Sequence, residues 1–240
     1  MAFTLDTYTV EARLMPVLIT VFPIAIAIAL ATWLPGQSAT WNFVGTVILA
    51  FGLTLLLAQV GRDLGKRKEG ELFAAWGGIP TTHLLSYRMT TLDRLTLDRY
   101  HAKLKNLLPE LTIPGPQEEM KNPSEANRIY ESCVRFLRER TRDQVKFPLV
   151  FAENVNYGFR RNMWALKPPG LLTTVLGILG STIFVVHNWS AKSGTFVFAL
   201  IAIGINAGLL LLWIFLINPS WVRLAARAYA ERLLGSLDAP

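Results

Sequence analysis

The sequence has a single cysteine, Cys133, so no disulfide can form within the chain. This scarcity fits a reducing compartment, and the place of Cys133 on an apolar helical stripe favours packing over nucleophilic chemistry. Histidine is also scarce, because the chain has only His83, His101 and His187, and their scattered positions match no metal-ligand spacing. We therefore expect no metal and no cofactor. The central region lacks the apolar–polar alternation of half-buried strands, which indicates helices.

Charged residues are absent from four long apolar segments, residues 14–34, 43–60, 170–186 and 195–217. Apolar residues make up 52% of the chain and are concentrated in these segments. A helix needs about 20 apolar residues, within a range of roughly 17–25, to cross the hydrocarbon core of a bilayer. The four segments therefore predict four transmembrane helices, since a soluble core rarely contains charge-free stretches of this length.

The positive charges indicate which side of the membrane each loop faces. Residues 62–167 contain 19 of the 24 lysines and arginines, whereas residues 35–42 contain none and residues 187–194 contain only Lys192. Basic loops stay in the cytoplasm by the positive-inside rule. The distribution predicts that both termini and the central region lie in the cytoplasm.

The chain accordingly divides into an N-terminal hairpin (1–61), a basic cytoplasmic domain (62–167) and a C-terminal hairpin with a short tail (168–240). The expected fold class is an all-α integral membrane protein, in which two transmembrane helical hairpins flank a small α-helical cytoplasmic domain. Within that domain, the spacing of apolar residues predicts a helix in residues 91–108. A second amphipathic helix is expected to follow a cap at Ser124.

Other elements of the domain are expected from local signals. A third helix is predicted over about residues 147–166, and residues 111–123, LTIPGPQEEMKNP, are predicted to form a proline-rich loop. Thr81 and Thr82 are expected to cap a helix that starts near His83.

The central domain carries 19 basic and 13 acidic residues, a net charge of +6. Attraction to anionic lipid headgroups explains such a charge beside a membrane and is the simpler interpretation. Binding of a phosphate-bearing ligand or of nucleic acid is the more specific interpretation, and nucleic acid is the less favoured of these two ligands. The lipid bilayer is the partner that the apolar segments and the charge both predict.

Residues 61–66, GRDLGK, resemble a phosphate-binding loop only superficially. A Walker A loop has the form G-x-x-x-x-G-K-[ST]. Here three residues separate Gly61 from Gly65, Arg67 stands in place of the required Ser or Thr, and a transmembrane helix precedes the segment instead of a strand. We interpret GRDLGK as the cytoplasmic end of the second span, with its basic residues at headgroup level.

Residues 76–82, WGGIPTT, are a second candidate for ligand binding. Gly77 and Gly78 permit backbone angles that other residues avoid. A tight structural turn explains this sequence, and so does a loop whose backbone N–H groups approach a ligand. In the ligand hypothesis, Trp76 and Thr81 belong to the site.

Residues 151–162, FAENVNYGFRRN, are unusually polar for an amphipathic helix. Glu153, Asn156, Tyr157 and Arg160 recur at helical spacing and share one face. Three interpretations stay open: a buried hydrogen-bonded network, contact with lipid headgroups, or a pocket whose arginines bind phosphate. The ligand hypothesis assigns the pocket to these residues and their neighbours: Arg142, Glu153, Asn156, Tyr157, Arg160 and Arg161, with Trp76 and Thr81.

The fourth apolar segment contains Gly204-x3-Gly208, a pattern of small residues that lets transmembrane helices approach closely. We interpret Gly204 and Gly208 as a candidate oligomer interface and expect a homo-oligomer.

Together, GRDLGK, WGGIPTT, TRD (141–143) and ENVNYGFRRN (153–162) resemble the signature of an uncharacterised family of bacterial membrane proteins. The resemblance implies a location in the bacterial inner membrane but no activity. The layout of two hairpins around a small basic domain is similar to that of small membrane proteins in antiphage defence systems. Some of those are nucleotide-gated effectors that breach the inner membrane, and others are sensors coupled to a soluble partner. This similarity concerns layout alone and assigns no residue a role.

The leading functional hypothesis is a non-enzymatic inner-membrane protein whose cytoplasmic domain receives a signal and passes it to an oligomeric transmembrane bundle. In its effector form, a nucleotide-like, phosphate-bearing ligand gates a pore or disrupts the membrane as an antiviral defence. The alternative is a non-conducting sensor or scaffold that recruits a soluble protein partner. An enzyme is the least favoured class, because the sequence offers no catalytic cluster.

Overall fold

The computed structural model describes residues 6–32, 39–189 and 194–239, without the side chains of residues 31–32, 39–53, 55–56 and 194–195. These described residues form helices and no strand, which confirms the all-α fold class. The chain separates into two compact units. The bundle unit is Met1–Lys68 with Gly158–Val222, and the domain unit is Glu69–Tyr157 with Arg223–Pro240.

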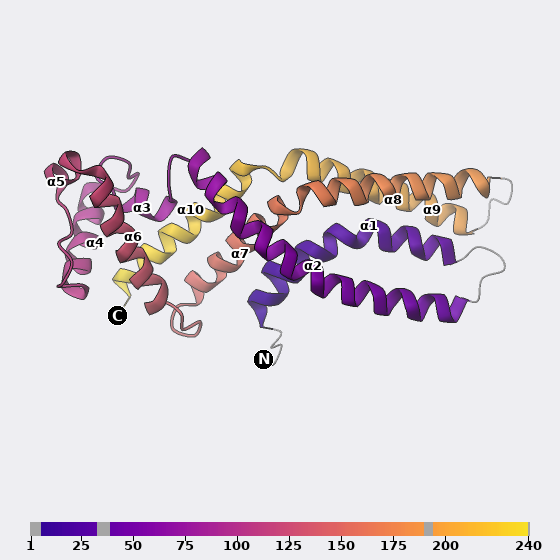
Figure 1. Ribbon diagram of the computed structural model, residues 1–240, viewed down its shortest axis with the longest axis horizontal. Helices are drawn as coiled ribbons and strands as arrows, with labels where there is room; N and C mark the ends of the chain where they lie inside the picture. Colours follow the sequence, from indigo (N-terminus) through magenta and orange to yellow (C-terminus); the bar gives the residue numbers. More distant parts are fainter. Residues whose placement is uncertain (1–5, 33–38, 190–193, 240) are drawn as a thin grey trace. The chain divides into compact units, whose positions relative to one another are not determined.

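Each unit has some helices of its own, and three further helices contribute residues to both units (Figure 1). The bundle unit contains the π-helical η1 (Thr9–Leu14), α1 (Met15–Thr32), α8 (Lys167–His187), α9 (Gly194–Leu211) and the π-helical η2 (Leu212–Leu216). The domain unit contains α3 (Pro80–Leu85), α4 (Arg94–Leu107), α5 (Pro116–Lys121), α6 (Pro123–Arg140) and η3 (Ser236–Asp238). Helices that contribute residues to both units are α2 (Ala39–Ala75), α7 (Pro148–Ala165) and α10 (Pro219–Gly235).

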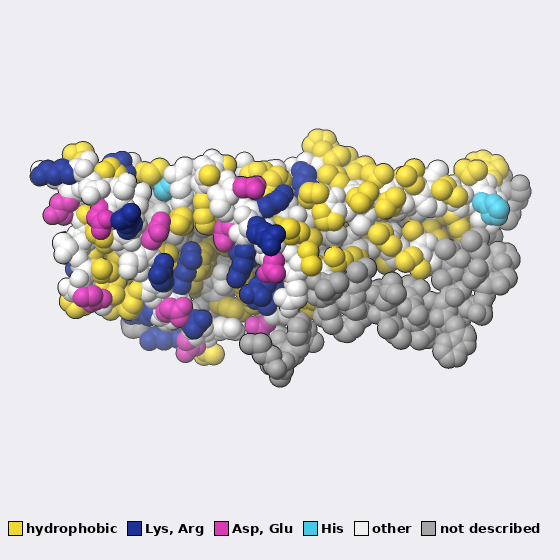
Figure 2. All heavy atoms as spheres, viewed as in Figure 1, with side chains coloured by type: hydrophobic (Ala, Val, Ile, Leu, Met, Phe, Trp, Pro, Cys, Tyr) yellow, Lys and Arg dark blue, Asp and Glu magenta, His cyan; other side chains and the backbone are white. Residues whose placement is uncertain are grey.

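Three helices in the described part of the chain are long and apolar enough to cross a membrane: Thr9–Leu30, Lys167–His187 and Phe196–Leu216. They correspond to the first, third and fourth predicted spans. Figure 2 shows hydrophobic side chains gathered over α8 and α9, as expected for helices that face lipid. The second predicted span, residues 43–60, lies in α2, where most of its side chains fall outside the described residues. The arrangement of four spans therefore stays a prediction.

In the bundle unit, α8 packs along both α1 and α9. Gly170 of α8 faces Trp213, and a Cβ atom at Gly170 would overlap the indole ring. Gly177, two helical turns further along α8, lies close to two other helices: an added Cβ would be 2.9 Å from the Cβ of Pro23 in α1 and 3.1 Å from the Asn206 amide of α9. Small residues allow such close approach, and the resulting van der Waals contact helps to hold helices together in lipid.

The core of the domain unit forms around α6. Tyr130, Cys133 and Leu137 are fully buried on one face of this helix, which confirms the apolar stripe predicted there. Burial raises the pKa of the Cys133 thiol to about 11, so it stays protonated at neutral pH. The C-terminal segment, expected to be a short tail, instead supplies α10 and η3 to the same core through Ala230, Leu233, Leu234 and Leu237.

Two helix starts near the proline-rich segment differ from the prediction. Residues 116–121 form α5, although the sequence pattern indicates a loop, because proline is favourable at the first position of a helix. The cap of α6 is Asn122 rather than Ser124, and its side-chain oxygen accepts a hydrogen bond from the Glu125 N–H at 3.2 Å. Pro123 then occupies the first helical position.

The start of α3 also differs from the prediction. This helix begins at Pro80, and its cap Ile79 makes no side-chain hydrogen bond. Thr82 lies inside the helix, where its hydroxyl donates to the Ile79 carbonyl at 2.8 Å instead of capping a helix near His83. Proline at the first position again defines the start, because its fixed φ angle suits a helix.

A buried carboxylate, Glu119 of α5, joins several parts of the domain unit. It accepts hydrogen bonds from the Ser86 hydroxyl, from the Tyr87 N–H at 2.8 Å and from the Tyr130 hydroxyl at 3.0 Å. Arg88 Nε pairs with it at 3.2 Å. Burial by itself raises the pKa of Glu119, but these donors outweigh burial and hold the pKa below its ordinary value.

The Glu119→Gln substitution should destabilise the protein, because the amide cannot accept from all these donors and leaves Arg88 unpaired. We expect the free energy of unfolding to fall by about 3 kcal/mol, measured by chemical or thermal unfolding of the full chain in detergent. The exposed Glu110→Gln is the matched control and should have little effect. Equal stability of the two variants would contradict the role of Glu119.

The same residue should make stability depend on pH. Because the folded pKa lies below the ordinary value of 4.5, the stabilisation by Glu119 is complete above that pH. This stabilisation is lost as the pH falls through the folded pKa of Glu119. The free energy of unfolding of Glu119→Gln should therefore fall less between neutral and acidic pH than that of the unchanged protein.

Candidate functional site

Helix α7 carries five of the residues that the sequence predicts as a ligand site. Glu153, Asn156 and Tyr157 belong to the domain unit, whereas Arg160 and Arg161 belong to the bundle unit. Their contacts within each unit show what these polar side chains do in the folded chain.

In the domain unit, the polar residues of α7 bond to other side chains. The buried Tyr157 donates its hydroxyl proton to Glu69 Oε1 at 2.6 Å, and its ring stacks on Tyr229 with 6.3 Å between centroids. Asn156 Nδ2 donates to Glu153 Oε2 at 3.4 Å. Tyr157 therefore ties α7 to α2 and α10 within this unit.

In the bundle unit, both arginines of α7 contact protein groups. Arg160 Nη1 donates to the Trp221 carbonyl at 3.1 Å, and its guanidinium lies 4.9 Å from the centre of the Trp221 ring. Arg161 is buried, and its Nη2 donates to Asn162 Oδ1 at 3.5 Å. These contacts favour the structural-network interpretation of the α7 face over a ligand site.

Asn162 belongs to this network, although the sequence pattern did not assign it a role. Ala12 lies in the π-helical η1, and its backbone carbonyl faces the Asn162 side chain. Asn162 Nδ2 supplies a donor at 2.7 Å, and its side chain is completely enclosed. The amide thus provides a hydrogen bond between α7 and η1 inside the bundle unit.

The glycines of GRDLGK and ENVNYGFRRN lie where helices of the bundle unit touch. A Cβ at Gly65 would overlap Asn162 Oδ1, and a Cβ at Gly158 would lie 2.9 Å from the Tyr8 hydroxyl. GRDLGK is helical and continuous with α2. These observations explain the glycines by packing, in agreement with the rejection of a phosphate loop.

The remaining predicted site residues have three different surroundings. Arg142 follows α6, is exposed and pairs with Glu139 at 3.1 Å. Thr81 in α3 is buried, and its hydroxyl has no hydrogen-bond partner in the described parts of the chain. Trp76 is almost completely buried against Phe73, and it borders an open cavity.

This cavity, the Trp76 recess, lies in the domain unit and has a volume of about 80 Å³. Its walls combine apolar and cationic side chains, in a space large enough for one small polyatomic group. It is lined by Trp76, Pro80, His83, Leu84, Met89, Thr91, Arg223 and Arg227.

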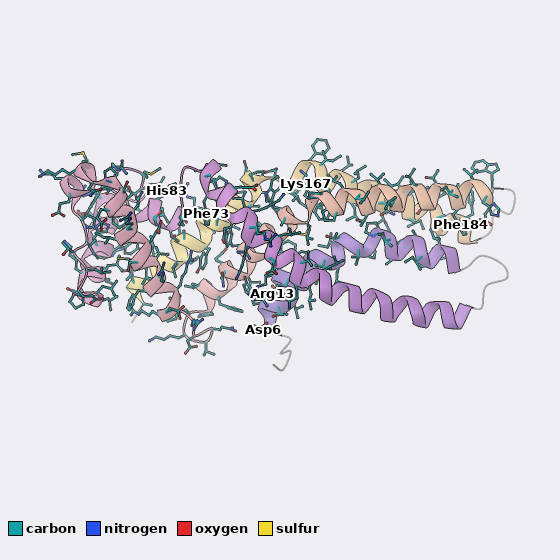
Figure 3. All side chains as sticks on the ribbon, in the orientation of Figure 1. Asp6, Arg13, Phe73, His83, Lys167 and Phe184 are labelled. Atoms are coloured by element: carbon teal, nitrogen blue, oxygen red, sulfur yellow. The ribbon has the colours of Figure 1, made fainter. Side chains whose placement is uncertain are left out.

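The WGGIPTT segment shapes one wall of the Trp76 recess. Gly77 and Gly78 have φ angles of +79° and +140°, which residues with a side chain rarely adopt. The turn brings the Gly77 carbonyl to His83 Nε2 at 3.0 Å, so this nitrogen carries the proton and donates it. A Cβ at Gly78 would overlap the same ring. Both glycines therefore allow the turn that fixes the imidazole of His83 on α3 (Figure 3).

The positive charge of the recess comes from α10. Arg223 and Arg227 are one helical turn apart and share a face. Arg227 is oriented by Glu231, at 3.0 Å from its Nε, and by the Thr91 hydroxyl, at 2.7 Å from its Nη2. Arg223 is exposed at the rim. Guanidinium groups bind phosphate and carboxylate oxygens through paired hydrogen bonds, so the recess has the chemistry of an anion site.

One wall of this recess can be predicted from the sequence, whereas its positive charge cannot. Trp76 was part of the predicted site, whereas His83 looked like a scattered histidine and the arginines of α10 looked like a cytoplasmic tail. The local signal for the charge is the spacing of Arg223 and Arg227, which places both on one helix face. No local pattern links them to WGGIPTT, which is far away in the sequence.

Two further predictions concern assembly and metals. Gly204 and Gly208 lie on an exposed face of α9, and a Cβ at either would meet no atom within 4 Å. The candidate interface is therefore open in the single chain, and the homo-oligomer stays a prediction. Within the described ranges, no three His, Cys, Asp or Glu residues gather as metal ligands.

Comparisons with protein families, with curated proteins and with solved structures found no match for this chain.

The Gly65→Ala substitution tests the packing role of GRDLGK. The added methyl group should displace the Asn162 amide from Ala12, which lowers the free energy of unfolding in detergent by about 2 kcal/mol. The matched control is Gly70→Ala on the same helix, because a Cβ there meets nothing within 4 Å. The control should be neutral or stabilising by roughly 0.5–1 kcal/mol.

The double variant of Gly65→Ala with Asn162→Ala provides a second check. Because both substitutions remove the same contact, the double variant should lose less free energy of unfolding than the two single variants lose in sum. Additive costs would mean that Gly65 and Asn162 act independently.

Proposed function

We propose that this chain is a membrane protein that senses an anionic, phosphate-bearing ligand in its domain unit and transmits binding to its membrane-spanning helices. The observation that carries the proposal is the position of Arg223 and Arg227. Both line the Trp76 recess, and both lie on α10, which begins at Pro219, shortly after the span Phe196–Leu216. An anion that pulls on these arginines acts on the helix that directly follows the last span.

The composition of the recess supports a phosphate group as the part that is recognised. Arg227 is already oriented by Glu231 and Thr91, so less side-chain freedom is lost when an anion binds. The cavity of about 80 Å³ accommodates a phosphate-sized group but not a whole nucleotide. Trp76 and the exposed Met89 offer apolar surface beside the cations for the rest of a ligand.

Continuous helices support transmission of the signal. α2, α7 and α10 each contribute residues to both units, so a rotation or shift of one of these helices can act in both. The orientation with the domain unit in the cytoplasm of a bacterial inner membrane rests on the distribution of basic residues.

Two outcomes of ligand binding correspond to the two hypotheses from the sequence. If the response opens the bilayer, as in a defence effector, the ligand should release a trapped dye from liposomes that contain the protein. If the response recruits a soluble partner, the liposomes should stay sealed in the presence of the ligand.

The anion site is tested with inorganic phosphate, titrated calorimetrically into the full chain in nanodiscs of neutral lipid. We expect saturable binding that weakens by about tenfold or more in Arg223→Ala and in Arg227→Ala, because each removes charged hydrogen bonds. Arg232→Ala on the same helix is the matched control, because Arg232 is exposed and does not line the recess. Equal effects of all three variants would refute a site at the recess.

A second arm identifies the source of the phosphate. Nanodiscs that contain phosphatidylglycerol present lipid headgroups to the same protein. Loss of phosphate binding in these discs means that the headgroup competes for the recess, and unchanged binding means that the site takes a soluble ligand.

Homo-oligomer formation is tested separately at α9. Gly204→Leu and Gly208→Leu should leave the fold of a single chain intact, since the space around both glycines is open. The bulky side chains should separate the helices of neighbouring subunits and lower the oligomer fraction seen by cross-linking in membranes. Unchanged oligomers in both variants would exclude this face as the interface.

A further inference from the structure

Asn206 lies at the centre of a membrane-spanning helix and is completely buried. The span Phe196–Leu216 has 21 residues, and Asn206 is the middle one. Gly177, which faces it, is the middle residue of the 21-residue span Lys167–His187. The amide is therefore at the depth where a bilayer offers no solvent for hydrogen bonds.

Neither polar atom of the Asn206 amide has a hydrogen-bond partner in the described chain. The hydroxyl of Ser181, one turn along α8 from Gly177, is also fully buried and unpartnered. Other buried polar atoms without a partner among the described residues of this unit include Arg13 Nε and the indole nitrogen of Trp213. By contrast, the hydroxyl groups of Thr20, Thr173 and Thr174 donate to helix carbonyls at 2.8, 2.6 and 2.7 Å, respectively.

A third helix reaches the same level. A Cβ on Gly177 would lie 2.9 Å from the Cβ of Pro23 and 3.1 Å from both polar atoms of Asn206, so α1, α8 and α9 meet there. Pro23 lies inside α1 and has no N–H, so the Ile19 carbonyl loses its donor within the helix. Donors and acceptors thus gather at the middle of an otherwise apolar bundle.

This concentration of polar groups has a physical cost that an apolar residue at position 206 would avoid. An unpaired amide in a water-free interior is unfavourable, and the bilayer offers no relief. A cation would need compensating charge, but residues 14–32, 168–186 and 196–216 contain no acidic side chain. One water molecule makes about three hydrogen bonds in a buried polar site, which suits an amide donor and acceptor beside a carbonyl.

We propose that Asn206, with Pro23 and Gly177 beside it, forms a binding site for internal water at the centre of the membrane bundle. Water bound there accepts a hydrogen bond from Asn206 Nδ2 and donates to Asn206 Oδ1 or to the backbone carbonyl of Ile19. The Ser181 hydroxyl, one turn away, extends the polar surface along α8. The site marks the level at which this bundle admits water, and it is independent of the anion recess.

The test is water-edited solid-state NMR of the full chain, labelled with ¹⁵N-asparagine and reconstituted in lipid. This measurement follows how fast magnetisation passes from water protons to each side-chain amide. Asn206 should receive it several-fold faster than Asn162, an equally buried amide that instead bonds to the Ala12 carbonyl. The exposed Asn106 is the reference for an amide in contact with water.

The Asn206 signal is assigned by its disappearance in Asn206→Leu, or in Asn206→Ser if the leucine variant does not fold. Transfer to Asn206 at a rate close to that of Asn106 supports the water site. Transfer as slow as to Asn162 overturns it, because that result means that the Asn206 amide is dry.

Discussion

The bundle unit depends on the close approach of α8 to its neighbours. Lipid tails are as apolar as leucine, so membrane helices gain little by burying apolar surface against one another, and tight contact must hold them together. Gly170 and Gly177 provide this contact, since the indole of Trp213 and the amide of Asn206 occupy the space that larger residues would fill. Gly65 and Gly158 serve the same purpose for α2 and α7.

Close packing in lipid also requires that backbone and side-chain polar groups be satisfied within the protein. Pro23 in α1 creates such a need, because it cannot donate to the Ile19 carbonyl of the preceding turn. The Asn162 amide donates directly to the Ala12 carbonyl, whereas the unpartnered amide of Asn206 beside Pro23 is the basis for the proposed water site. In the domain unit, Glu119 has a comparable role, because it accepts hydrogen bonds from several donors. The apolar core of that unit is stabilised in addition by the hydrophobic effect.

The positive charge that borders a cavity lies on α10, not on α7. The polar face of α7 attracts attention in the sequence because arginine, asparagine and tyrosine are dense there, yet Tyr157, Arg160 and Arg161 have partners within the fold. Arg223 and Arg227 border an open recess and belong to a helix that begins close to the end of a span. A charge near a cavity is available to a ligand, whereas a charge that binds the backbone mainly stabilises the fold.

The sequence alone determined the helical class, three apolar spans and the buried stripe of α6, because hydrophobic periodicity and segment length are local properties. Pro80, Pro116 and Asn122 are also local signals for helix starts, although the predicted caps were Ser124, Thr81 and Thr82 instead. The Trp76 recess could not be predicted whole, because its walls come from WGGIPTT and from arginines near the other end of the chain. Only tertiary structure decided which polar residues are already paired and which face a cavity, since pairing depends on distances between helices that no local pattern encodes.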